Sequence, residues 1–494
     1  MPIRPLKHFI RIIVPIIVFS ACQDNDSSKE RDYTYIGGEI VNPNVDYVIL
    51  FSEKGVGDTV KLDRNNRFIY KVKNLKDGIY SFKHNPENQL ILLEKGDSLL
   101  FRLNTFEFDE SLVFSGDGAR KNNFLIESFL KNEKERNDLQ RKGYSIPPQK
   151  FQRYQDSIYK IRLHEYFRLI EKTDLSDVSK KILKASFDYD YYSRFELYHY
   201  RHYGITDLDS IKDLPNDFFD YRNEVDYNDI DLKRLYGYNR YLNNYFTNAA
   251  YVNYAKGNSF YLDPVGNTTY KLGLVDSLIT DPYIKNNMLR GITTRFLLDS
   301  RNEELSNNVL EYYLKVSKNK TSQKDMIKLA KATSKLKPGN TISDQTLIAA
   351  EGDEIKISEL LHKPVTALYF WSMDDIKHSI KAHKTAFYLS KIYPEINFIA
   401  INIDDEETKD WQRTIKRYNY NPLTEYEFKH PNCATEEFVL YDKERVILLD
   451  KQGKILDAHA NLFSPVFETH LINTLRKEIY QKEKATPKLS AALK

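Results

Sequence analysis

The sequence lacks both a strong net charge and long hydrophobic runs. Its 73 Lys and Arg residues are balanced by 70 Asp and Glu residues, which leaves a formal net charge of +3 over 494 residues. A nucleic-acid-binding protein usually carries a basic patch, so this balance argues against a nucleic-acid partner. The mean hydropathy of −0.58 and the 29% of charged residues exclude a protein with many membrane spans.

Cysteine is almost absent. The chain has two, Cys22 and Cys433, and the pattern around Cys22 predicts that this thiol is lipidated. Cys433 would then be the one free thiol of the mature chain, which is too few for an intramolecular disulfide in an oxidising compartment. The fold must therefore be held by its apolar cores. We interpret Cys433 as an ordinary free cysteine rather than a peroxidase-like nucleophile.

Residues 1–21 have the pattern of a signal peptide. Three basic residues precede an apolar stretch, 12–19, that is too short to span a bilayer. Residues 19–22, Phe-Ser-Ala-Cys, resemble a bacterial lipobox with Phe where Leu is usual, and this resemblance implies cleavage before Cys22 and its lipidation. The alternatives are an ordinary signal peptide or an uncleaved anchor. Residues 22–32 then form a polar tether, so we expect the protein to contact the membrane through a lipid anchor.

The rest of the chain has three parts with different sequence periods. Residues 33–116 alternate with period two between turns, as in a β-sandwich-like domain or open barrel. Residues 117–335 have a period near 3.6 and little Gly or Pro, which predicts a helical domain with aromatic packing. Residues 336–482 alternate strands and helices, as in a small α/β domain, and 483–494 resemble a tail. The sequence therefore predicts a multidomain protein.

The helical part contains one candidate pair of metal ligands. His199 and His202 lie three residues apart, so both can face the same side of a helix. No third ligand is evident near them, and we interpret both as packing or surface histidines. The sequence predicts no metal site and no cofactor.

Four stretches of the α/β part recur together in a known family: PGNTISDQTL at 338–347, YFWS at 369–372, YPEINFIAINID at 393–404 and VILLDKQGKI at 446–455. In this order they resemble the thioredoxin-like domain of TlpA-type envelope lipoproteins. The preceding β-rich and helical parts resemble the region often fused to such domains. The resemblance implies a thioredoxin fold tethered in the Gram-negative cell envelope, at the outer membrane, with either a periplasmic or a surface face.

The resemblance fails at the family's redox chemistry. The two cysteines of the family's Cys-x-x-Cys motif match Asp375 and His378, and its cis-proline matches Glu444, or Arg445 with a one-residue shift. Dithiol exchange needs one thiolate to attack and a second thiol to resolve the mixed disulfide. Aspartate and histidine do neither, so the sequence argues against thiol–disulfide reductase activity.

Asp375 has two possible roles. As the first residue of an expected helix, 375–393, it can cap the helix and favour its dipole without any chemistry. Alternatively, an Asp375–His378 pair can act as a non-redox acid–base site. His383 does not join this pair, because it is expected on an apolar face with Ile376, Ile380 and Phe387. Ser372 lacks the glycines of a nucleophile turn.

These features favour an envelope lipoprotein with a non-catalytic binding or assembly role and a protein or peptide partner. The alternatives are a redox protein related to thiol–disulfide oxidoreductases and a non-redox enzyme that uses Asp375 and His378. The missing dithiol distinguishes the non-catalytic lipoprotein from the redox protein. The non-redox enzyme requires the Asp375 and His378 side chains to lie within hydrogen-bonding distance in a cleft, which a structure can test.

Overall fold

The computed structural model describes residues 33–485 except 53–54, 56, 74, 86, 205–212, 255–262, 406–407 and 442. The signal peptide, the tether, Cys22 and most of the expected tail lie outside the described residues. Within the described ranges, every helix is too short or too polar to cross a bilayer.

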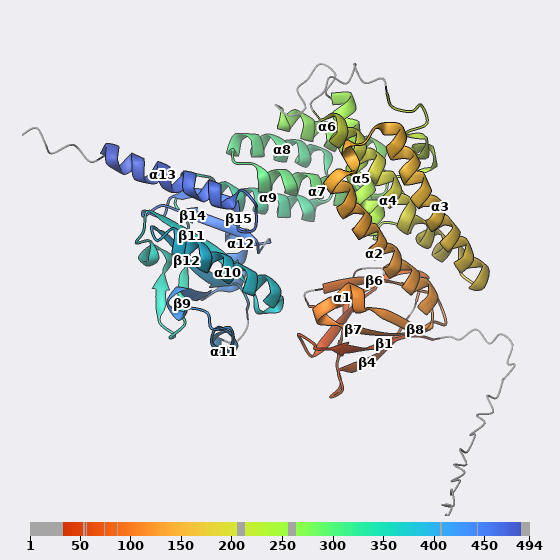
Figure 1. The fold of residues 1–494 in the computed structure, drawn as a ribbon, viewed down its shortest axis with the longest axis horizontal. Coiled ribbons are helices and arrows are strands. Elements are labelled where there is room, and N and C mark those ends of the chain that lie inside the picture. The colour runs from red at the N-terminus through yellow and green to blue at the C-terminus, as the bar shows by residue number, and fades with distance from the viewer. Residues whose placement is uncertain are drawn as a thin grey trace, which may run out of the picture.

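Two four-stranded sheets form the N-terminal part (Figure 1). Their strand orders are β4-β1-β7-β8 and β3-β2-β5-β6. Alternation decides which side chains enter the core: in β7, Leu99, Phe101 and Leu103 are buried while their neighbours face outward. The Phe101 ring stacks on Phe82 of the other sheet at 4.3 Å, within one shared apolar cluster. The elements are β1 (Thr34–Val41), β2 (Tyr47–Phe51), β3 (Gly57–Lys61), β4 (Arg67–Val72), β5 (Gly78–His84), β6 (Glu87–Leu93), β7 (Ser98–Asn104), a short α1 (Phe108–Ser111) and β8 (Val113–Asp117).

Helices make up the middle part: α2 (Ala119–Lys142), α3 (Pro148–Lys172), α4 (Asp177–Tyr203), α5 (Tyr236–Tyr254), α6 (Pro264–Leu278), α7 (Pro282–Asp299), α8 (Glu303–Val316) and α9 (Lys320–Lys335). Three consecutive helices begin at side-chain caps, supplied by Asp281, Asn302 and Asn319. The aromatic residues form core as predicted: Tyr238 and Tyr241 of α5 are fully buried, and both rings pack against Tyr189 of α4.

A seven-stranded sheet of order β10-β9-β13-β12-β11-β14-β15 forms the C-terminal part. The central strand β11 pairs in parallel with β12 and antiparallel with β14. Every residue of β11 is buried, because both faces of the sheet are covered. The elements are β9 (Thr346–Ala349), β10 (Glu354–Lys356), β11 (Val365–Trp371), α10 (Ile376–Ile392), β12 (Ile396–Asn402), α11 (Thr408–Tyr418), β13 (Glu425–Phe428), α12 (Pro431–Glu437), β14 (Arg445–Leu449), β15 (Ile455–Asn461) and α13 (Phe467–Ala485).

Two expectations for this part are wrong. The strand β13 and the helix α12 were not expected between α11 and the final hairpin, because the four residues of β13 include two glutamates and give no apolar signal. The apolar face expected for α10 is also wrong. Ile380 and Phe387 are 44% and 64% exposed, whereas small side chains such as Ala382 and Ala386 face the sheet. Small residues let the helix approach the sheet closely. His383 is therefore buried on this face, although Ile380 and Phe387 are not.

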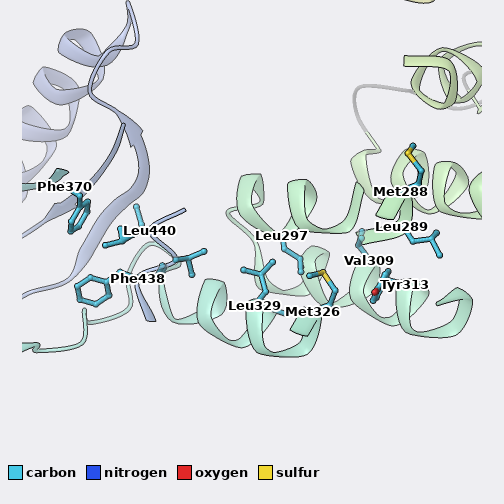
Figure 2. Packing of buried hydrophobic residues seen from close by; sticks show 14 of the residues in the cluster. Met288, Leu289, Leu297, Val309, Tyr313, Met326, Leu329, Phe370, Phe438 and Leu440 are labelled. Atoms are coloured by element: carbon cyan, nitrogen blue, oxygen red, sulfur yellow. The ribbon is translucent and has the colours of Figure 1, made fainter. Parts of the chain in front are cut away.

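The helical part and the C-terminal sheet share one apolar cluster. Figure 2 shows this cluster passing from Val309, Met326 and Leu329 in α8 and α9 towards Phe438 and Phe370. Ion pairs at its edge join α9 to α12, namely Lys328–Glu436 at 2.7 Å and Lys335–Glu437 at 3.3 Å. The two parts are therefore packed as one body.

The N-terminal sheets are joined to the helices by buried polar contacts. Asn122 of α2 exchanges two hydrogen bonds of 2.8 Å with the backbone of Leu92 in β6. The fully buried Lys121 pairs with Glu94 at 2.6 Å and Asp97 at 2.7 Å. A buried cation is tolerated where carboxylates pair with it. These contacts therefore hold α2 against the N-terminal sheets.

Candidate functional site

The site suggested by the sequence is the corner between β11 and α10. Parallel strands end at the same edge of a sheet, so the chain leaving β11 meets the chain leaving β12. There the Asp404 carboxylate accepts a hydrogen bond of 2.6 Å from the Met373 backbone N–H. A short 3₁₀ turn, Met373–Asp375, then leads into α10.

Asp375 caps α10. Its Oδ1 accepts a hydrogen bond of 3.0 Å from the backbone N–H of His378, one of the first-turn donors without a partner inside the helix. Ser372 is buried, with 2% of the residue exposed. Its hydroxyl accepts a similar hydrogen bond of 3.2 Å from the Asp374 N–H. Both side chains therefore end the strand and start the helix, and Ser372 is not presented as a nucleophile.

His378 does not form an acid–base pair with Asp375. Neither ring nitrogen makes a close hydrogen bond among the described residues, and the hydrogen-bonding group that acts on the ring is the Lys443 backbone, not Asp375. The ring meets Phe463 edge-on at 5.5 Å. Burial lowers the pKa of His378, while the charge of Asp375 opposes this shift. The capping bond uses the backbone N–H of His378, and the Asp375 carboxylate makes no hydrogen bond with the imidazole.

The residues that the sequence analysis matched to the motif nevertheless lie near one another. Lys443 and Glu444 lie close enough for their charges to act on His378. Glu444 is exposed and accepts a hydrogen bond of 2.7 Å from the Asn461 side chain, and Arg445 is buried with Nη1 donating to the Val439 carbonyl at 2.9 Å. This polar loop therefore lies beside the start of α10.

The same corner faces the N-terminal sheets. The Asn85 side chain, in the turn after β5, donates to the Asp374 carboxylate, and the Lys377 ammonium donates to the Phe106 carbonyl. Burial raises the pKa of Asp374, and the charge of Asp404 adds to the increase. The corner is a contact between two parts of the chain that are 289 residues apart in sequence.

A buried acid–histidine pair lies behind the corner, and the sequence did not reveal it. His383 Nε2 is 3.0 Å from Glu425 Oε1, and its Nδ1 is 2.7 Å from the Ser379 carbonyl. The ring of Tyr420 stacks on the imidazole at 3.5 Å between centroids. A carbonyl only accepts, so Nδ1 carries a hydrogen and a second proton must lie between Nε2 and the carboxyl group. The pair gives both ring nitrogens of His383 a partner, while Glu425 Oε2 is buried without one in the described part of the chain. The two side chains are 10% and 1% exposed.

The other candidate residues have structural roles. His199 Nδ1 is 2.9 Å from the Asn248 amide oxygen, and His202 Nδ1 is 2.6 Å from the Tyr144 carbonyl, which confirms the packing interpretation. Cys433 is exposed on α12. No group of three or more His, Cys, Asp or Glu side chains within the described ranges is arranged to hold a metal ion.

Comparison with known proteins identifies similar structures over parts of the chain. No family model matches the sequence, and no curated protein matches it. A thioredoxin-like protein from Bacteroides caccae covers 57% of this chain and 92% of its own length, at 16% identity and a TM-score of 0.33. The thioredoxin domain of a thiol-disulfide oxidoreductase from Bacteroides vulgatus covers 28% and 99%, at 18% identity and a TM-score of 0.24. An exposed lipoprotein thioredoxin from Streptococcus pneumoniae covers 27% and 99%, at 13% identity and a TM-score of 0.23.

Replacing Asp375 distinguishes capping from acid–base chemistry. Asp375→Asn keeps a good cap and is expected to leave the melting temperature nearly unchanged. Asp375→Ala removes the cap and should lower the free energy of unfolding by about 1 kcal/mol. Thermal unfolding and a complementation phenotype are measured for both variants, with Glu395→Ala as a control at an exposed carboxylate. Loss of phenotype in Asp375→Asn at an unchanged melting temperature would show that the carboxylate does acid–base work and would overturn the non-catalytic role.

The Glu425–His383 pair predicts a pH dependence of stability. Burial raises the pKa of Glu425 above its ordinary value of 4.5, so the folded chain holds this proton more tightly than the unfolded chain. Stability contributed by this group is full below 4.5 and falls as the pH rises towards the raised value. Glu425→Gln removes the titration, and its stability should vary less with pH in urea unfolding than that of the exposed control Glu395→Gln. An identical pH profile in both variants would contradict this role.

Proposed function

We propose that the protein is an outer-membrane lipoprotein of the Gram-negative envelope with a binding or assembly role. In this proposal its C-terminal domain is a thioredoxin-like fold without redox chemistry, and its partner is a protein or peptide. The lipid anchor is Cys22. The observation that carries the proposal is the capping bond of Asp375 at the position where the resemblance puts an attacking thiolate.

A helix start stabilises either a thiolate or a carboxylate by the same donors and dipole. Asp375 fills this position with a permanent charge and a hydrogen bond of 3.0 Å. A carboxylate there maintains the helix start but cannot form a mixed disulfide. The substitution therefore supports a domain retained for its shape.

The contacts of the corner support a role in recognition. Asp374 and Lys377, which flank the cap, contact Asn85 and Phe106 of the N-terminal part. A surface that already contacts another part of the chain has polar groups of the kind found in protein interfaces. Binding a protein or peptide is the use that we propose for it. The acid–base alternative is disfavoured because the His378 imidazole and the Asp375 carboxylate make no hydrogen bond.

The proposal predicts redox inactivity. The purified protein should not accelerate the reduction of insulin by dithiothreitol, because the two positions of the dithiol are Asp375 and His378. Turbidity is followed over time with an active thioredoxin as the positive control. Turnover that persists in Cys433→Ser would show that the chain catalyses the exchange by another route and would overturn the proposal.

The anchor is tested separately. Cells that produce the protein are labelled with a palmitate analogue, and the wild-type chain should take up label and enter the detergent phase. Cys22→Ser should lose the label, whereas Cys433→Ser, the matched control at the other cysteine, should keep it. Label in Cys22→Ser, or none in the wild type, would refute lipidation at Cys22.

A further inference from the structure

The helical part contains a large cavity distant in sequence from the corner. Its volume is about 1020 Å³, and its walls come from α5, α6, α7 and the start of α8. A second cavity of about 620 Å³ lies against β6 and α2 and shares Tyr236, Asn239 and Arg240 with the first. Arg240 therefore lies where the two cavities adjoin.

Positive charge dominates the larger cavity. Its described lining has four cationic side chains, Arg240, Lys271, Arg295 and Arg301, against one acid, Asp299. Arg301 pairs with Asp457 of β15 at 3.0 Å. Lys271 and Arg295 form no ion pair of 4 Å or less with any described residue, and nor does Asp299. Burial lowers the pKa of Lys271 to about 8, and the nearby charge of Arg295 adds to this.

Arg240 has bonding capacity that the chain does not use. One nitrogen, Nη2, pairs with Asp190, but Nε and Nη1 are buried without a hydrogen-bond partner in the described part of the chain. Asp190 also pairs with Arg136 at 3.3 Å and with Arg194 at 2.5 Å, and Arg194 has a second carboxylate partner, Glu135, at 2.7 Å. Two carboxylates therefore serve three guanidinium groups. Burial, together with Arg136, lowers the pKa of Arg240 to about 10. An anion at Nε and Nη1 would satisfy these donors and offset the excess positive charge.

The remaining lining suits an organic ligand. Gly291 lies inside α7, where glycine costs about 0.5–1 kcal/mol relative to alanine. A Cβ at this position would meet no atom within 4 Å, so packing does not require glycine there. The lining also combines Phe246 and Phe296 with the amides of Asn243 and Asn244, and the Asn244 Nδ2 is buried without a partner. Apolar walls with a few polar groups are typical of small-molecule sites.

We propose that this cavity binds a small organic polyanion, whose carboxylate or phosphate groups are held by Arg240, Lys271 and Arg295. The uncharged part of the ligand lies against Gly291 and the two phenylalanines. The inference goes beyond the function proposed above and does not depend on the thioredoxin-like domain or on the lipid anchor.

Titration calorimetry on the full-length protein in detergent tests the site with two probes, citrate for carboxylates and pyrophosphate for phosphates. The ionic strength is held constant because salt screens exposed charges. At least one probe should bind saturably, and the preferred probe identifies the anion chemistry. Lys271→Gln and Arg295→Gln should each weaken binding about tenfold or more, since each removes a charge-assisted contact.

Two further variants separate the cavity from general charge. Gly291→Leu fills open space without changing the charge and should abolish binding, while its melting temperature reports that the fold is kept. Arg413→Gln removes an exposed arginine on α11, outside the cavity, and should bind as the wild type does. Failure of both probes to bind the wild type overturns the proposal. So does unchanged affinity in Lys271→Gln, Arg295→Gln and Gly291→Leu, since binding would then occur elsewhere.

Discussion

The apolar cluster shared by the helices and the C-terminal sheet is the constraint on which the other features depend. Alternate residues of β11 belong to two cores: Leu368 and Phe370 face the cluster shared with the helical part, and Tyr369 and Trp371 face α10. Turning the sheet relative to the helices would expose one set to water, which the hydrophobic effect opposes. The one cysteine of the described residues, Cys433, is free, so in this part of the chain packing and polar contacts, with no disulfide, hold Arg301 against Asp457 and the corner towards Asn85.

In this packed structure, the burial of each polar side chain determines which contacts it must make. Asp375, at a helix start, accepts a hydrogen bond from a backbone N–H and becomes a cap, while the His378 ring three residues later forms no hydrogen bond with it. His383 and Glu425 are buried deeply enough that each needs the other, and Lys121 is held by two carboxylates for the same reason. A histidine near an aspartate in sequence is thus a poor guide to chemistry. The deciding observation is which atoms the side chains reach.

The sequence predicted those features that depend on local pattern. The continuous apolar run at 365–371 and the alternation at 98–104 gave strands, and Asp375 before a helical run gave a cap. It failed where distant parts of the chain determine burial. Glu425 lies in β13 because β12 pairs with it, β9 pairs with the residues that follow it, and His383 supplies a side-chain partner. None of these is near it in sequence. The face of α10 was misassigned because size alone does not tell which side meets a sheet: alanines fit there, and Phe387 does not.

The cavity between α5, α6, α7 and α8 was also beyond prediction from local sequence patterns. Arg240, Lys271 and Arg295 lie on three different helices, separated by 31 and 24 positions, and no spacing rule connects them. Each alone is an unremarkable basic residue on a helix that also carries acids or amides. Only the packing of α6 against α5 and α7 makes their charges converge, and within the described residues Lys271 and Arg295 have no carboxylate partner. An excess of buried positive charge is costly unless an anion offsets it. The unused donors of Arg240 therefore indicate more about ligand binding than Asp375 and His378 do, because there the chain satisfies its own helix start.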